Sequence, residues 1–239
     1  MRRLALFYGV VCYITFLVVL LYLIFFIAGF LVPKTLDTGE PVPMVQGFLV
    51  DGALIALFGL QHSVMARRSF KSWWTSTVPE CVERSTYVLA TSLVFIVLIR
   101  YWQPLPGNVW RVDGPLPKGG LYIISALGWG LVLFSSFLTN HWDLFGLRQT
   151  FLYSRGRRYT PVPFKESSLY RYIRHPMMLG VLVAVWATPE MSISHLVLAV
   201  GFSLYIVVGV HFEEQALKRD IGDPYVSYQR RTTRFFPFY

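Results

Sequence analysis

The sequence predicts an all-α fold, a polytopic membrane helical bundle with five long transmembrane helices and one short helix. Hydrophobic residues make up 54% of the 239 residues and charged residues only 15%, whereas a water-soluble domain carries about 25% charged residues. The mean hydropathy is +0.49. Apolar stretches of about 18 or more residues recur, and each can cross the roughly 30 Å hydrocarbon core of a bilayer. We therefore expect an integral membrane protein with one domain over residues 1–239.

Six apolar segments are predicted to form the bundle. The first is too long for the apolar region of a signal peptide and has no small-residue cleavage site. The fifth is too short to cross a bilayer alone, so it is expected to form a helical hairpin with the sixth. A C-terminal cytoplasmic helical segment should follow. The predicted segments are residues 4–32, 46–66, 85–102, 120–139, 176–188 and 192–212.

The positive charge indicates an orientation in the membrane. The net charge of +9 would be compatible with nucleic-acid binding, but almost all Lys and Arg fall on one side of the predicted spans. The positive-inside rule makes that side the cytoplasm and places both termini there, in what is expected to be a bacterial inner membrane. No nucleic acid and no obligate protein partner is indicated. The exceptions on the other side are Lys34, Arg100, Arg111 and Lys118.

Histidines gather at one predicted depth. A lone His at a helix end is usually a surface or capping residue, but four of the five fall at the cytoplasmic ends of four different spans. Ionisable groups at membrane depth indicate a functional site. These histidines are His62, His141, His175 and His211, and polar neighbours of His141 are Asn140, Asp143, Arg148 and Gln149.

The stretch RHPMMLG, residues 174–180, opens the short fifth segment. Pro176 suits the first turn of a helix, where a missing N–H is tolerated. The free N–H groups of that turn, together with Arg174 and His175, would form an anion site. Gly180 would allow another backbone or a ligand to approach closely. The simpler interpretation is a capped helix start with an Arg side chain that reaches toward the interface.

Two glutamates are predicted to face this positive site. Glu214 and Lys218 are in the favourable i,i+4 order, so a helix-surface ion pair is one interpretation of Glu214. Glu213 points about 100° away on the helix and has no such partner. A positive site opposed by carboxylates would fit a zwitterion with ribose hydroxyls, such as S-adenosylmethionine.

These motifs resemble a known family. R-H-P-x-x-x-G, the glutamate pair, Gly222-x-x-Tyr225-x-x-Tyr228 and a basic run that ends in Pro237 are similar to the membrane methyltransferases, which include isoprenylcysteine carboxyl methyltransferase and the phospholipid N-methyltransferases. QHSVMAR (residues 61–67) and NHWDLFGLRQ (residues 140–149) resemble the NnrU-like branch. The resemblance covers about residues 46–237. It implies methylation of a small thiol, methanethiol to dimethyl sulfide, with S-adenosylmethionine as methyl donor.

The resemblance and the chemistry assign a role to each candidate. Because a thiolate is the nucleophile, a base is needed, and His62 and His141 are the candidates, with Asp143 to orient one of them. Met178 departs from the wider family, which has Tyr there. No metal ligand is expected, and about residues 140–239 should hold the cofactor. The expected cofactor contacts are Arg174, His175, Pro176, Gly180, Glu213, Glu214, Tyr225, Tyr228 and Arg230. The expected substrate contacts are Gln61, Asn140, Gln149 and Met178.

Three other interpretations are open. The acceptor could be a lipid or a prenylated thiol or carboxyl group. Four histidines at one depth, with His211 and Glu214 at i,i+3, could instead hold a metal or haem, although a helix N-terminus beside Arg174 would repel a cation. The third is a membrane scaffold without an active site, in which the polar cluster would have no purpose.

Overall fold

A computed structural model describes residues 1–236 and confirms the polytopic helical fold. Five helices are long and apolar enough to cross a membrane. Pro237, the end of the basic motif, lies outside the described residues. The five helices are α1 (Arg2–Ala28), α2 (Met44–Ala66), α4 (Glu80–Tyr101), α5 (Pro115–Thr139) and α9 (Ile193–Ile221).

The chain forms two compact units. Unit 1 contains Met1–Val109, Asn140–Pro161 and Met191–Leu198, and unit 2 contains Trp110–Thr139, Val162–Glu190 and Ala199–Tyr239. The portion from residue 140 onward, which we expect to hold the cofactor, is thus shared between the units. The prediction of a single domain stays a prediction.

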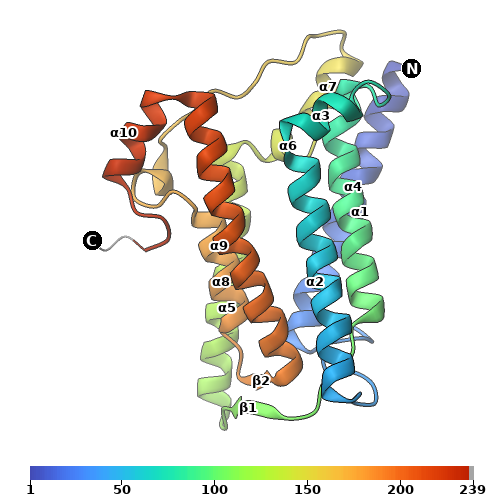
Figure 1. The fold of residues 1–239 in the computed structure, drawn as a ribbon, viewed down its shortest axis with the longest axis vertical. Coiled ribbons are helices and arrows are strands. Elements are labelled where there is room, and N and C mark those ends of the chain that lie inside the picture. The colour runs from blue at the N-terminus through green and yellow to red at the C-terminus, as the bar shows by residue number, and fades with distance from the viewer. Residues whose placement is uncertain (237–239) are drawn as a thin grey trace. The chain divides into compact units, whose positions relative to one another are not determined.

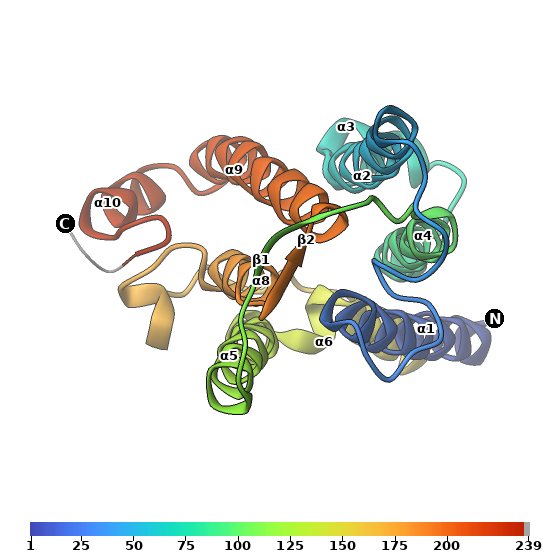
Figure 2. The same cartoon turned by 90° about the horizontal axis from the view of Figure 1, so that it is seen from below.

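In unit 1, α4 packs against both α1 and α2 (Figures 1 and 2). The first span ends at Ala28, earlier than expected, because Gly29 adopts a left-handed φ of 82° and caps α1. The short helix α3 (Arg68–Trp74) follows α2, and α6 (His141–Leu144) and α7 (Leu147–Ser154) follow α5. Gly146 has φ +87°, and a Cβ there would lie 2.6 Å from Ser85 N, so this turn can sit against the start of α4.

In unit 2, the short helix α8 (Pro176–Trp186) packs closely along α5 (Figure 2). A Cβ on Gly180 would lie 2.7 Å from the carbonyl oxygen of Gly128, so two helix backbones meet at this pair. The predicted hairpin partner α9 also contacts α8, because Trp186 Nε1 donates to Ser203 Oγ at 2.9 Å. The close approach expected at Gly180 is therefore made by the backbone of α5.

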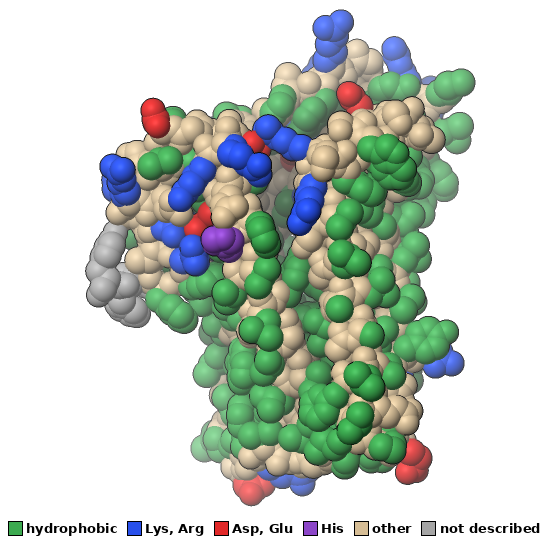
Figure 3. All heavy atoms as spheres, viewed as in Figure 1, with side chains coloured by type: hydrophobic (Ala, Val, Ile, Leu, Met, Phe, Trp, Pro, Cys, Tyr) green, Lys and Arg blue, Asp and Glu red, His purple; other side chains and the backbone are tan. Residues whose placement is uncertain are grey.

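The C-terminal part of unit 2 is helical, as predicted. α9 extends to Ile221, and α10 (Asp223–Arg231) begins after Gly222, with Pro224 in its first turn. A 3₁₀ turn, η1 (Ser168–Arg171), precedes α8. On the face drawn in Figure 3, hydrophobic side chains follow α9, and charged side chains gather around α10 and the adjacent end of α9.

Two short strands complete the fold. β1 (Asn108–Arg111) and β2 (Glu190–Ser192) pair in a two-stranded sheet. Arg111 and Glu190 form an ion pair across these strands.

Candidate functional site

His62 lies in an aromatic setting near the end of α2, in unit 1. Its ring centroid is 5.1 Å from that of Tyr87 and 5.3 Å from that of Phe58. Its Nδ1 is 3.4 Å from the hydroxyl of Thr91. The Arg84 guanidinium lies 4.9 Å from the centre of the Tyr87 ring. The Tyr87 ring therefore contacts both this cation and His62.

Arg84 joins this region of α4 to the turn that holds His141. Its Nε donates to the carbonyl oxygen of Leu144 in α6 at 2.8 Å, and Ser85 Oγ donates to the carbonyl oxygen of Gly146 at 3.3 Å. These bonds connect the start of α4 to the α6–α7 turn, and the Tyr87 ring connects it to His62 at the end of α2. That His62 and His141 share one depth in the membrane stays a prediction.

His141 is buried, with 3% exposure, inside a cage of aromatic rings. Its Nε2 is 2.6 Å from the hydroxyl of Tyr13 on α1, and Phe145 and Trp142 meet its ring edge-on at 4.8 and 5.3 Å. Burial lowers the pKa of His141 from its usual 6.5. The imidazole is therefore neutral near pH 7 and can accept a proton.

Asp143 has partners other than a histidine. One carboxylate oxygen accepts from Arg148 at 2.8 Å and the other from the hydroxyl of Tyr159 at 3.1 Å. Its backbone N–H donates to the side-chain oxygen of Asn140, which caps α6. The group that holds His141 is Tyr13, so the orienting role expected of Asp143 stays a prediction.

Two buried amide oxygens in unit 1 have no hydrogen-bond partner among residues 1–236. They are Oε1 of Gln61 and Oε1 of Gln149. The amide nitrogen of Gln61 donates to Met65 Sδ at 3.1 Å and that of Gln149 to the carbonyl oxygen of Asp143 at 3.2 Å. A buried acceptor without a partner is unfavourable, so both oxygens could accept from a ligand donor. The substrate roles of Gln61 and Gln149 stay predictions.

In unit 2, Arg174 is occupied by the protein itself. Its Nε donates to Glu214 Oε1 at 2.8 Å, and its Nη1 donates to the carbonyl oxygens of Gln229 and Thr232. The side chain is only 8% exposed. The sequence predicts that this guanidinium contributes to an anion site for the cofactor, whereas in the structure it joins the start of α8 to α9 and α10.

The two glutamates differ sharply in environment. Glu214 is 4% exposed and accepts from Arg174, Arg234 and Gln229, so its partner is not Lys218 on its own helix surface. Glu213 is 50% exposed, and its Oε2 lies 3.7 Å from Nδ1 of His175. Glu213 is therefore the carboxylate that a ligand can reach.

His175 lies between the two carboxylates. It is buried, and its Nε2 is 3.2 Å from Glu214 Oε1. Burial lowers the pKa of His175, and the neighbouring carboxylate of Glu214 acts in the opposite direction. The two ring nitrogens of His175 thus lie 3.2 Å from the buried carboxylate and 3.7 Å from the exposed one.

The two predicted tyrosines of α10 are both 2% exposed but differ in bonding. The hydroxyl of Tyr228 donates to the carbonyl oxygen of Tyr170 at 2.6 Å, and burial raises the pKa of Tyr228 to about 12. The buried hydroxyl of Tyr225 has no partner among the described residues. Burial raises the pKa of Tyr225 as well, and the nearby charge of Glu214 adds to the effect.

The remaining cofactor candidates lie on α8 and α10. Pro176 is buried as the first residue of α8, and Met178 is half-buried two residues before Gly180. Arg230 is exposed on α10. Their predicted contacts with a ligand stay predictions.

Sequence reasoning missed several residues of these networks. Arg84 and Arg234 contributed only to the count of basic residues, and Tyr13 and Gln229 belong to none of the sequence motifs described above. Their partners lie far away in the sequence, so no local spacing could reveal them. In residues 1–236, no group of three or more His, Cys, Asp or Glu side chains is arranged to hold a metal ion.

The chain is similar to several known proteins. The profile of the family described as NnrU protein matches residues 52–237. A methanethiol S-methyltransferase of Crocosphaera subtropica is 43% identical over 99% of this chain and 93% of its own length. One of Mycobacterium tuberculosis is 44% identical over 99% and 97%. Nurim of Xenopus laevis is 32% identical over 66% of this chain and 58% of its own. No solved structure matches.

Proposed function

Because the chain belongs to the NnrU protein family, we propose that it is a methyltransferase that transfers a methyl group from S-adenosylmethionine to the sulfur of a small thiol. Methanethiol is the proposed acceptor and dimethyl sulfide the product. The observation that carries the proposal is the 43–44% identity over 99% of the chain to proteins named methanethiol S-methyltransferase. The proposed location is the bacterial inner membrane, with the basic end and both termini in the cytoplasm.

Two features of unit 2 fit the cofactor. The half-exposed carboxylate of Glu213 is suited to its ammonium or to a ribose hydroxyl. The buried hydroxyl of Tyr225, which has no partner within residues 1–236, is suited to one of its polar groups. When bound, S-adenosylmethionine supplies an electrophilic methyl group on a sulfonium sulfur.

Arg174, His175 and Glu214 are proposed to hold that binding region in shape. Glu214 neutralises Arg174 and Arg234 and contacts His175, so the start of α8, the end of α9 and the segment after α10 keep fixed positions. Fixed side chains that meet a ligand without reorganisation are a main source of catalytic advantage. In this proposal Arg174 acts mainly through its neighbours.

Unit 1 is proposed to activate the thiol. A thiol must lose its proton to become a nucleophile, and the imidazoles of His62 and His141 are the groups assigned to take it. His141 is buried and neutral, and the hydroxyl of Tyr13 holds its ring at 2.6 Å. The aromatic rings around both histidines would exclude water and accommodate a small apolar substrate.

The test combines binding and turnover on the purified protein. Calorimetry measures binding of S-adenosylmethionine, and gas chromatography of the headspace measures dimethyl sulfide formed from methanethiol. We expect both for the unchanged protein, weaker binding for Glu213→Gln, and unchanged binding for the control Glu190→Gln in β2.

Loss of activity should separate the roles of the two histidines. His62→Ala and His141→Ala are expected to bind S-adenosylmethionine normally, and at least one of them should lose methylation. If the unchanged protein bound no S-adenosylmethionine, or methylated a lipid acceptor and not methanethiol, the proposal would be wrong. Accessibility of cysteines introduced at the termini, probed in cells and in inverted vesicles, tests the orientation.

A further inference from the structure

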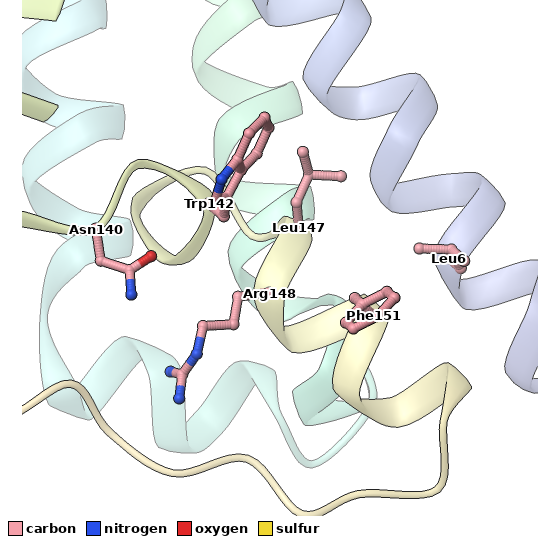
Figure 4. Close-up of a pocket in the computed structure, with 6 residues that line it drawn as sticks. All are labelled: Leu6, Asn140, Trp142, Leu147, Arg148 and Phe151. Atoms are coloured by element: carbon pink, nitrogen blue, oxygen red, sulfur yellow. The ribbon is translucent and has the colours of Figure 1, made fainter. Parts of the chain in front are cut away.

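A pocket of about 410 Å³ lies on the surface of unit 1. Figure 4 shows Leu6 of α1 extending toward Leu147 and Phe151 of α7, with Trp142 of α6 nearby. Trp142 and Phe151 are each about half exposed, so their rings form open apolar walls. The volume falls within the range of about 300–1,000 Å³ that is typical of ligand sites.

The polar residues of this pocket are already bonded. Arg148 donates to Asp143 and to Thr160 at 2.8 Å, and its guanidinium lies 5.3 Å from the centre of the Tyr159 ring. Asn140 accepts from the backbone of Asp143. The pocket therefore presents a mainly apolar lining, because its polar side chains already bond to other residues of the protein.

Positive charge surrounds one end of the pocket. The guanidinium of Arg155 lies 5.5 Å from the centre of the Phe151 ring. A Cβ on Gly156 would meet Arg2 Nη1 at 3.0 Å, so the start of α1 lies beside the end of α7. Arg2, Arg3 and Arg155 are exposed and form no ion pair with a carboxylate in the described part of the chain.

We propose that this pocket binds an anionic phospholipid, with an acyl chain along Leu6, Trp142, Leu147 and Phe151 and the phosphate at Arg2, Arg3 and Arg155. The positions of Arg2 and Leu6 along the axis of α1 agree with this assignment. Leu6 is four residues after Arg2, which places it about 6 Å further along the helix axis. Phosphates at the arginines would thus put the first acyl carbons beside the apolar walls.

The positive charge beside the pocket favours an anionic lipid over a neutral ligand. The three arginines lack carboxylate partners, so an anionic head group satisfies them. Each basic side chain near an anionic membrane surface strengthens lipid attraction about fivefold. A neutral small thiol would leave these charges unused, and a zwitterionic lipid would gain less from them.

Photo-crosslinking in lipid nanodiscs tests the site. Phosphatidylglycerol and phosphatidylcholine with a photoreactive group on the acyl chain are incorporated separately, and labelled peptides are mapped by mass spectrometry. We expect phosphatidylglycerol to label the peptides of Leu6 and Trp142 above other lipid-facing helices. Arg155→Gln and Arg2→Gln should each reduce this labelling about fivefold, and the control Lys118→Gln should not.

A substitution that fills the pocket with a larger side chain provides a second test. Leu147→Trp should abolish labelling of the peptide that contains Trp142 while methyltransferase activity and the melting temperature stay near those of the unchanged protein. Equal labelling by both lipids, or labelling spread evenly over the helices and insensitive to the arginine variants, would overturn the proposal. Displacement of label by a soluble alkyl thiol would instead make the pocket a thiol site and would equally overturn it.

Discussion

Replacement of Tyr225 by Phe should stabilise the fold and weaken cofactor binding at the same time. Tyr225 is 2% exposed, and its hydroxyl has no hydrogen-bond partner among residues 1–236. An unsatisfied buried polar group costs roughly 1–3 kcal/mol. Its removal should therefore raise the free energy of unfolding of the ligand-free protein by about that amount, and the melting temperature by about 2–4 °C for each kcal/mol.

The same substitution removes the bond that the proposed cofactor would make. A loss of roughly 1–3 kcal/mol corresponds to a dissociation constant about 5–150-fold higher. Thermal unfolding followed by circular dichroism in detergent, with and without S-adenosylmethionine, measures the first effect, and calorimetric titration measures the second. The stabilisation that the ligand gives to the unchanged protein should shrink in Tyr225→Phe.

Tyr228→Phe is the matched control, because it lies on the same helix and is equally buried. Its hydroxyl donates to the carbonyl oxygen of Tyr170 at 2.6 Å, so its loss leaves a carbonyl unpaired and should lower the melting temperature. The reasoning is refuted if Tyr225→Phe melts lower than the unchanged protein and binds S-adenosylmethionine with the same affinity.

Three further predictions concern the same networks. Glu214→Gln should lower the free energy of unfolding by about 3–5 kcal/mol, because it leaves the buried charge of Arg174 uncompensated. Glu213→Gln should leave the melting temperature unchanged and weaken cofactor binding. Equal melting temperatures of the two variants would contradict this. Gly180→Ala places a Cβ about 2.7 Å from a backbone oxygen of α5 and should destabilise by about 1–3 kcal/mol, which chemical denaturation would show. The pKa of His141 lies below 6.5, so the imidazole is largely neutral above pH 6.5. The neutral fraction falls as the pH drops through the pKa. The rate ratio of the unchanged enzyme to His141→Gln should drop over that acidic range, and a constant ratio would exclude His141 as the base.

The spans were predictable because each depends on a local run of apolar residues. Pro176 as the first residue of a short helix was predictable for the same reason, since a proline at that position acts locally. The seven-residue helix α3 was not, because its basic sequence reads equally well as a loop. Its three aromatic and two basic residues lie in a segment too short to show a helical period.

The partners of the candidate residues could not be predicted. Glu214 had a plausible local partner four residues on, but Arg174, which is 40 residues away in sequence, binds it instead. Burial decides between them, because a carboxylate removed from water needs stronger and more numerous donors than an exposed lysine supplies. Which of two adjacent glutamates is buried depends on helix packing, which the sequence does not state.

The attachment of the C-terminal segment has a consequence for biosynthesis. Ile173 pairs with Thr233, and the backbone N–H groups of Arg174 and His175 donate to the carbonyl oxygens of Thr233 and Arg234. Thr233 and Arg234 follow all five membrane-spanning helices in the sequence, so the network around His175 can close only after the segment that follows α10 has been synthesised. A polypeptide that stops after α10 would contain all five long helices and still lack Arg234, which pairs with Glu214, and the backbone bonds that Thr233 and Arg234 accept beside His175.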